Sequence, residues 1–310
     1  MRPTVRRYDL RVRDDVAVVI VSYNSAHVIE GLLESLPAAL GALTASTVVV
    51  DNGSTDNSTD VAAAFGGCKI VRSENNGYAG GVNRGVDALA RAESILVLNP
   101  DVRLEAGSVE TMFATLKSSK AGVVAPKVLE PDGSLFRSLR REPTLLRATG
   151  LSFTHWPVVD EYISEPEAYA HRQVVDWALG AALLVRTEVY TQLSGWDESF
   201  FLYSEETDFS LRAADLGWAT IYEPDAVVMH IGGQSGQNER THAMQIINRV
   251  RLYARRHRRP AALAYYLLAV LSEISWAARG NSKSPAAIRA LLRPGKRPKE
   301  LGCSDSLIPR

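Results

Sequence analysis

Polar side chains follow three of the apolar runs in this 310-residue chain. They are Ser22, Tyr23 and Asn24 after residues 16–21, Asp51 and Asn52 after residues 47–50, and Asn99 and Asp101 after residues 94–98. A carboxylate at such a place can accept hydrogen bonds from a ribose or a base, or can bind a hard divalent cation together with phosphate oxygens. Asx residues also favour turns and helix N-caps, which is the structural alternative for Asp51.

A divalent cation needs more than one protein ligand, and His230 is the candidate partner of Asp101. His230 follows the apolar run 226–229, so it also lies at the predicted end of a strand. A single histidine is more often structural than ligating. Its expected place near Asp101 favours the metal-ligand interpretation.

The densest polar segment is residues 75–85, Asn-Asn-Gly-Tyr-Ala-Gly-Gly-Val-Asn-Arg-Gly. Gly77 and Gly80 permit backbone angles and close approaches that other residues do not. The segment opens a predicted helix, and helix N-termini favour phosphate. It matches neither the dinucleotide fingerprint nor a Walker loop. The alternative is an irregular loop that caps a helix.

Three acids, Glu205, Glu206 and Asp208, begin another predicted helix directly after the aromatic run 200–203 and Ser204. Acids suit a first helical turn, which is the structural interpretation. The apolar approach predicts instead that at least one carboxylate is partly desolvated. Its pKa would then be raised towards working pH, as a general base requires.

The apolar runs predict the elements that would position these groups. Expected strands are 16–21, 47–50, 69–72 and 94–99, and expected helices are 25–36 (capped by Ser25), a short one after residue 56, and 78–92. Strands that alternate with helices predict a parallel α/β sheet, which binds ligands at the carboxyl ends of its strands. The polar clusters described first all lie at that edge.

The second half of the chain is less regular. Residues 126–170 are rich in turn formers and are expected to form a long excursion. Further expected elements are a strand at 181–186, helices at 187–193 and 205–216 (Phe209, Leu211 and Leu216 inward), strands at 219–222 and 226–230, and a helical region 241–278 broken at Pro260. Beyond Arg279 the composition predicts a flexible tail.

The composition of the chain limits the kinds of partner and the setting that are expected. Lys+Arg and Asp+Glu both number 35, so no overall field attracts nucleic acid, and none is expected as a partner. Cys68 and Cys303 have no metal-ligand spacing, and a reduced, cytoplasmic setting is expected. The apolar run 261–271 is shorter than the roughly 20 residues of a membrane span, so no transmembrane helix is expected.

Residues 249–259 contain six arginines and no acid. Arg251, Arg255, Arg258 and Arg259 can share one helical face, and two interpretations fit. The face is solvated and the following helix packs on the domain, or residues 249–278 make peripheral contact with anionic lipid, with Tyr265, Tyr266 and Trp276 at the interface.

Taken in order, these motifs resemble glycosyltransferase family 2, which has the GT-A fold. They are Val-Ser-Tyr-Asn (21–24), Val-Asp-Asn-Gly-Ser-Thr-Asp (50–56), the segment 75–85, Leu-Asn-Pro-Asp (98–101), Asp-Trp-Ala-Leu-Gly-Ala (176–181), Gly-Trp-Asp-Glu-Ser-Phe-Phe (195–201), Glu-Glu-Thr-Asp-Phe-Ser-Leu-Arg (205–212), Gly-Trp (217–218) and His230. They span about two thirds of the chain. The Asn-Pro-Asp form and the Phe-Phe-Leu-Tyr approach are similar to the rhamnosyltransferase-like branch.

The resemblance implies a role for each motif. Asp51 and Asn52 would contact the nucleoside near Ser22, Tyr23 and Asn24; Asn76, Gly77, Asn83 and Asn99 would line the donor pocket; Trp177 and Gly180 would lie near the donor sugar and acceptor. Asp101 and His230 would bind Mg or Mn with the donor diphosphate. Glu206 occupies the position of the catalytic base, with Glu205 and Asp208 as alternatives. Two departures from the family pattern are Asn99, where an Asp is common, and Glu206, which is one methylene longer than the usual Asp.

The implied fold is a mostly parallel twisted sheet flanked by helices. The expected domains are an extension (1–15), a GT-A domain (16–240, its nucleotide-binding part ending at 105 and its acceptor and catalytic part following), C-terminal helices (241–280) and a flexible tail (281–310). The implied activity is inverting, metal-dependent sugar transfer, with rhamnose a candidate, from a dTDP- or UDP-sugar to a glycan, lipid-linked or small-molecule hydroxyl in cell-envelope polysaccharide synthesis. The expected setting is cytoplasmic or peripheral at the inner face of the plasma membrane.

The sequence leaves one other class of function open and disfavours two more. A non-catalytic nucleotide-sugar or glycan binder on the same fold fits the altered metal motif. A nicotinamide dehydrogenase is disfavoured because the dinucleotide fingerprint is missing. A glycoside hydrolase would need two carboxylates that flank the scissile bond and no nucleotide.

Overall fold

The structure, a computed structural model, describes residues 14–232, 238–303 and 307–308. The expected N-terminal extension therefore lies outside the described residues, except for Asp14 and Asp15, which begin the first strand.

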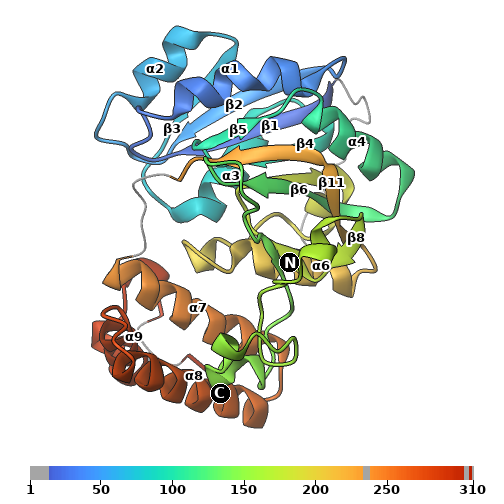
Figure 1. Cartoon of the computed structure of the whole chain (residues 1–310). Coiled ribbons are helices and arrows are strands. Elements are labelled where there is room, and N and C mark those ends of the chain that lie inside the picture. Colours follow the sequence, from blue (N-terminus) through green and yellow to red (C-terminus); the bar gives the residue numbers. More distant parts are fainter. Residues whose placement is uncertain (1–13, 233–237, 304–306, 309–310) are drawn as a thin grey trace, which may run out of the picture.

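The described residues form a central nine-stranded sheet in the order β3-β2-β1-β4-β10-β6-β11-β5, with β8 beside β11 (Figure 1). Its first four strands are β1 (Asp14–Ser22), β2 (Ala45–Asp51), β3 (Cys68–Arg72) and β4 (Ala92–Leu98). They pair in parallel, so their carboxyl ends share one edge. The expected α/β sheet and its first four strands are confirmed.

The sheet carries helices on both faces because successive strand residues point in opposite directions. Val16, Val18 and Ile20 of β1 belong to a core shared with α1 (Ile29–Leu40), α2 (Ser58–Phe65) and α4 (Ser108–Ser118). Ala17 and Val19 belong to a core shared with α3 (Gly77–Ala88), α5 (Thr187–Gln192) and α6 (Glu205–Asp215). A strand buried on both sides needs the continuous apolar run seen in the sequence.

Three helix boundaries differ from those predicted. Helix α1 begins at Ile29, and the Ser25 hydroxyl donates to the Tyr23 carbonyl and does not cap the helix. Helix α3 ends at Ala88, and Ala92 already belongs to β4. Helix α6 ends at Asp215, which leaves Leu216 exposed rather than inward.

The other half of the sheet is mixed. β10 (Ala182–Arg186) is antiparallel to both β4 and β6 (Ala121–Leu129). β11 (Ala219–His230) is parallel to β6 and antiparallel to β5 (Val102–Leu104) and β8 (Gln173–Val175). The two strands predicted at 219–222 and 226–230 are therefore one strand, with a register shift between Glu223 and Val227. Within the excursion, β7 (Leu139–Arg140) pairs with β9 (Trp177–Ala178).

The C-terminal helical layer consists of α7 (Glu239–Arg256), α8 (Arg259–Ala278) and α9 (Ser284–Leu292), and lies below the sheet in Figure 1. Pro260 occupies the first turn of α8, where its missing N–H is tolerated. The expected flexible tail instead contains α9, whose Ala287, Ala290 and Leu291 are buried in the core of this layer. Their helical spacing is hidden among the Pro, Gly and Lys residues that suggested flexibility.

Candidate active site

The ends of β1 and β2 bring the first predicted site residues together. The parallel register places Ser22 beside Asp51, and both are buried. Asp51 Oδ1 accepts a bond from the Ser54 amide at 3.2 Å, so the Asx turn exists. The Tyr23 side chain is exposed at the same edge. This edge therefore presents a carboxylate and an open aromatic ring, which can hydrogen-bond a nucleoside and stack on its base.

Three predicted donor-pocket amides are instead used within the protein. Asn24 Oδ1 accepts from the Thr55 amide at 2.8 Å, and Asn52 Nδ2 donates to the Gly77 carbonyl at 2.8 Å. Asn83 Nδ2 donates to Trp196 O and its Oδ1 accepts from the Tyr190 hydroxyl. These bonds hold together the loops at this edge of the sheet, and contact of the three amides with the donor stays a prediction.

Asn76 and Gly77, the other two residues of the segment 75–85 that were predicted to line the donor pocket, have different surroundings. The Asn76 side chain is exposed and its amide lies against the Arg84 guanidinium. Gly77 has φ of 82°, and a Cβ there would lie 2.2 Å from the Phe201 carbonyl oxygen. The Tyr78 amide donates to that same oxygen at 2.6 Å. Gly77 is therefore required for the close approach of α3 to the loop that precedes α6.

Asp101 and His230 meet as the sequence predicted. β5 begins directly after Asp101 and pairs antiparallel with the end of β11, so Val102 lies opposite His230. His230 Nε2 is 3.3 Å from Asp101 Oδ2, and this contact raises the pKa of His230. Asn99 contributes a backbone bond to the Ala181 carbonyl at 2.9 Å.

This pair has the geometry of two ligands of one cation. Neighbouring ligands of an octahedral Mg²⁺ lie about 3 Å apart when each is about 2.1 Å from the metal. Within the described part of the chain, no group of three or more His, Cys, Asp or Glu residues could hold a metal. A metal bound here would therefore take its remaining ligands from water or from phosphate, the shell that Mg²⁺ prefers.

The loop before α6 has an unusual backbone. Phe201, Tyr203 and Ser204 have φ of 58°, 68° and 73°, in the left-handed region that bulky residues seldom adopt. Asn248, fully buried on α7, donates from Nδ2 to the carbonyls of Phe200 and Tyr203 at 2.6 and 3.0 Å. It also donates to Leu202 O at 2.9 Å. The C-terminal helical layer thus holds the strained loop that leads to the acidic cluster, a link that the sequence did not reveal.

The three acids of α6 have distinct environments. Asp208 is paired with Arg212, with Nε 2.6 Å from Oδ2. Glu205 is only 4% exposed, and its Oε2 has no hydrogen-bond partner among the described residues. Glu206 is partly exposed and lies against Gly180, which has no side chain to separate the two. Only Glu206 combines partial exposure with a carboxylate not occupied by an arginine.

Electrostatics separates Glu205 from Glu206. Burial raises the pKa of Glu205 well above its usual range, and the charge on Glu206 adds to the effect. Burial also raises the pKa of Glu206, but Arg140 and the amide groups of Glu206, Thr207 and Gly180 oppose the rise. Burial therefore raises the pKa of Glu205 more than that of Glu206, and of the two carboxylates Glu206 is the one whose surroundings favour the charged form.

Arg140 is a site residue that sequence reasoning missed. Its guanidinium is buried, 3.8 Å from the Tyr162 ring centroid and 5.9 Å from that of Trp177. Trp177 Nε1 donates to the Arg141 carbonyl at 3.1 Å, which ties β9 to the excursion. An arginine in an irregular segment carries no periodic signal, so nothing in the sequence singled it out.

The acids from distant segments gather around one tyrosine. Tyr78 donates its hydroxyl to the Gly180 carbonyl at 3.3 Å. Burial raises the pKa of Tyr78, and the charges of Glu205, Glu206 and Asp101 raise it further. Gly180, which lies against Glu206, is followed by Ala181, whose carbonyl accepts from the Asn99 amide two residues before Asp101. The Asp101–His230 pair and the candidate base therefore lie in one region at the sheet edge.

Comparisons with known proteins agree with this geometry. The family model "Glycosyl transferase family 2" matches residues 17–165, and "Glycosyl transferase family group 2" matches residues 94–270. The N-acetylglucosaminyl-diphospho-decaprenol L-rhamnosyltransferase of Mycobacterium tuberculosis is 31% identical over 240 residues, 70% of this chain and 76% of that protein. Rhamnosyltransferase WbbL of Escherichia coli is 24% identical over 228 residues, 69% of this chain and 83% of its own.

A solved structure shows the same fold. The mannosyltransferase PcManGT from Pyrobaculum calidifontis, in complex with GDP-Man and Mn²⁺, superposes with a TM-score of 0.56 at 17% identity, covering 94% of this chain and 83% of its own. The fold is therefore GT-A, as expected. With its ordered motifs and these relatives, the chain belongs to glycosyl transferase family 2, in the rhamnosyltransferase-like group, and is a hexosyltransferase.

Proposed function

We propose that this enzyme transfers a sugar, with rhamnose as first candidate, from a nucleoside diphosphate to a hydroxyl of a lipid-linked acceptor, with inversion at the anomeric carbon. One observation carries the proposal. Glu206, a carboxylate not paired with an arginine, lies against Gly180, and the next residue, Ala181, bonds to the segment that carries Asp101 and its partner His230. The Mycobacterium tuberculosis relative is named for a diphospho-decaprenol acceptor and for rhamnose, which supports the choice of substrates.

The donor would enter at the carboxyl ends of β1 and β2. Asp51 would accept hydrogen bonds from the ribose or base, and the exposed Tyr23 ring offers a face for stacking. Both dTDP- and UDP-sugars are candidate donors. Neighbours of the same fold hold GDP-Man or UDP-GlcNAc, so the fold accepts several bases.

Asp101 and His230 would hold Mg²⁺ or Mn²⁺. The 3.3 Å between their facing atoms and the complex of a GT-A neighbour with Mn²⁺ support this assignment. A divalent ion at this place supplies positive charge that offsets the charge developing on the leaving diphosphate. Binding requires a neutral His230, so protons compete with the metal.

Glu206 would act as the general base. Its Oε atom takes the proton of the acceptor hydroxyl as the acceptor oxygen forms a bond to the anomeric carbon and the bond to the nucleoside diphosphate breaks. Glu205 is buried, and its strongly raised pKa favours the neutral form, which would add no second negative charge beside the nucleophile. Asp208 serves to hold Arg212, which also donates to the carbonyls of Leu193 and Gly195.

The test is transfer by the purified full chain to a lipid-linked N-acetylglucosamine diphosphate, with dTDP-rhamnose and a panel of other nucleotide sugars as donors. We expect transfer that requires added Mn²⁺ or Mg²⁺ and a product of inverted configuration. Thermal shift with each donor, with and without Mn²⁺, identifies the donor independently. Tight donor binding with neither transfer nor donor hydrolysis would instead show a non-catalytic binder.

A further inference from the structure

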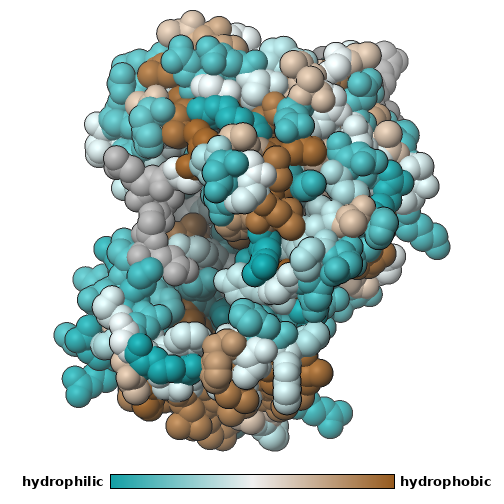
Figure 2. Space-filling view, viewed as in Figure 1, coloured by the Kyte–Doolittle hydropathy of each residue, from teal (hydrophilic) through white to brown (hydrophobic). Residues whose placement is uncertain are grey.

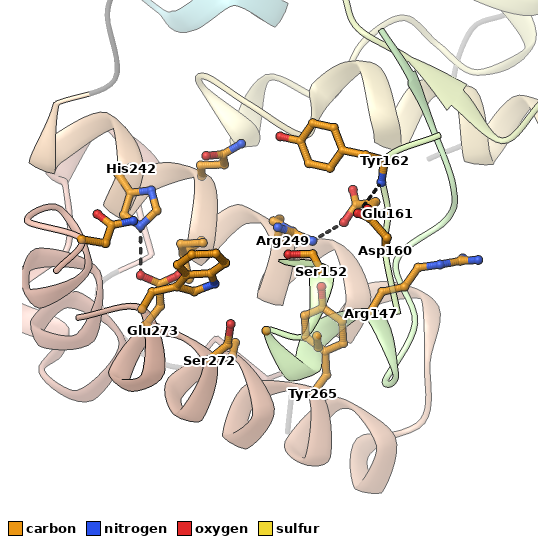
Figure 3. A pocket seen from close by; sticks show the side chains of 17 residues that line it. Arg147, Ser152, Asp160, Glu161, Tyr162, His242, Arg249, Tyr265, Ser272 and Glu273 are labelled. Carbon is orange, nitrogen blue, oxygen red and sulfur yellow. Dashed lines mark hydrogen bonds and ion pairs between the residues drawn. The ribbon is translucent and has the colours of Figure 1, made fainter. Parts of the chain in front are cut away.

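Helix α8 is arranged with its polar side inward. Tyr265 and Glu273 are buried, and Glu273 Oε2 lies 2.9 Å from His242 Nε2 on α7. These side chains face a pocket of about 260 Å³ between α7, α8 and residues 147–162 (Figure 3). The ion pair between Arg249 and Glu161 crosses the same pocket. The polar face of α8 is therefore occupied by the protein itself.

The opposite side of α8 is an apolar stripe. Leu263, Leu267, Leu271 and Ile274 are each 47–60% exposed. At about 100° per residue they lie on one face, roughly opposite Tyr265 and Glu273. Figure 2 shows this surface as a brown band along the bottom of the C-terminal helical layer. A helix that buries a tyrosine and a glutamate while three of its four leucines are exposed departs from the arrangement that water favours.

The charge around the stripe has one sign. Residues 258–299 contain nine Lys and Arg residues and a single acid, Glu273, which is buried, although the whole chain is neutral. Arg258 and Arg259 are exposed at the start of α8 and Arg279 at its end. An apolar stripe flanked by arginines complements a bilayer with anionic headgroups.

Aromatic side chains extend the surface at the C-terminal end of α8. The Arg279 guanidinium lies 4.7 Å from the Phe153 ring centroid and 4.3 Å from that of Trp276. Phe153 is half exposed, and Trp156, in the same excursion, is 71% exposed. Phenylalanine and tryptophan next to arginine are suited to the headgroup region of a bilayer.

We infer that the stripe of α8 docks on an anionic phospholipid bilayer, with the helix lying in the plane of the surface. By length and composition α8 is the one helix among the described residues that could cross a membrane. Its attachment to α7 through Glu273 and its packing against α9 favour an in-plane position. The residues differ from those expected from the sequence: Arg255 pairs with Asp197, Arg251 donates to Ser199 O, and Tyr265 is buried. The inference deepens the proposed function, because docking would bring the site to a lipid-linked acceptor.

The experiment is co-sedimentation of the full chain with vesicles of phosphatidylcholine alone and with vesicles that also contain about 30% phosphatidylglycerol. Wild type should bind the anionic vesicles at low salt. Leu267→Glu with Leu271→Glu should weaken binding at least tenfold, whereas the matched control Leu216→Glu with Val174→Glu, equally exposed residues of the sheet domain, should bind as wild type. Arg258→Gln with Arg259→Gln should flatten the salt dependence.

Several results would overturn the inference: wild type that ignores anionic vesicles at low salt, stripe variants that bind as wild type, or a stripe change that converts a dimer into a monomer while vesicle binding is absent. Unchanged circular dichroism and melting temperature show that the variants fold. Transfer to a short-chain soluble acceptor should be unaffected by the stripe variants. Vesicle binding by wild type without any transfer activity would sink the proposed function and leave the docking surface standing.

Discussion

The parallel half of the sheet and the C-terminal helical layer distribute polar and apolar residues in opposite ways. The central residues of strands β1, β2 and β4 are apolar and buried, and the site residues Ser22, Asp51 and Asn99 lie at or just beyond their carboxyl ends. Helix α8 buries Glu273 and Tyr265 and exposes its leucines. In the sheet the exceptions to the apolar pattern mark a site for a polar ligand. In the helix the inverted pattern marks a surface for an apolar partner.

The two regions are joined by the loop 201–204, which α3 contacts through Gly77 and α7 through Asn248. Helix α7 therefore contributes to both: it holds the loop before the acidic cluster on one side and the polar face of α8 on the other. Changes at the sheet edge should abolish chemistry. Changes in the helical layer should alter positioning and docking.

The largest effect is expected for Glu206→Gln. Loss of a general base should lower kcat by about 10²–10⁴-fold, with little change in donor affinity. Single-turnover transfer and donor titration by calorimetry would measure the two quantities. Glu205→Gln is the matched control and should retain most activity, because the raised pKa of Glu205 favours its neutral form, which Gln resembles. Full activity of Glu206→Gln would refute the assignment of the base.

Asp101→Ala should have the second-largest effect. We expect kcat/KM to fall by about 10²-fold, because charge stabilisation at the leaving diphosphate is lost. The stimulation by added Mn²⁺ should shrink with it. Transfer measured over a range of Mn²⁺ concentrations tests this expectation. An unchanged Mn²⁺ response would show that the metal, if any, is bound elsewhere.

Asn248→Ala should have a smaller effect on the same reaction, although it lies in the helical layer. Removing the amide leaves three loop carbonyls without that partner and should destabilise the fold by about 1–3 kcal/mol. Mispositioning of Glu206 should lower kcat about tenfold, with KM for the donor nearly constant. Asn281→Ala, in the same layer, is the control. A loss of stability with kcat unchanged would reduce Asn248 to a structural residue.

The smallest expected effect is that of Glu205→Gln on the pH dependence of the melting temperature. The pKa of Glu205 is raised in the folded state by burial and by Glu206, and the hydroxyls of Tyr78 and Tyr203 also lie within its field. The stability that protonated Glu205 contributes is complete below its unfolded pKa and is lost as pH rises through the folded value. Glu205→Gln should therefore match wild type at acidic pH and melt a few degrees higher at pH 8. A melting-temperature difference that does not grow with pH would contradict the raised pKa.

Prediction from the sequence worked best where the signal was local. The runs 16–21 and 47–50 are strands because continuous β-branched residues suit a doubly covered sheet, and their flanking residues necessarily reach its edge. Asp101 and His230 were placed together correctly because both end apolar runs. The helix 284–292 was missed because its buried residues are sparse within a composition typical of loops.

Roles within the site were harder to predict, because they depend on distant partners. The amide of Asn83, predicted to line the donor pocket, bonds to Trp196 and Glu198, more than a hundred residues away in the chain. Arg140 and Asn248 act on the acidic cluster from an irregular segment and from α7. The spacing of residues along the chain does not predict such contacts.

The sequence by itself determined the family, the parallel strands and the edge at which their polar residues gather, since each depends on residues adjacent in the chain. The tertiary structure decided which of those residues are free to bind, which of two neighbouring glutamates keeps the charge, and which side of α8 meets the surroundings. Burial and pairing set these outcomes, and both arise only when segments far apart in the chain pack together.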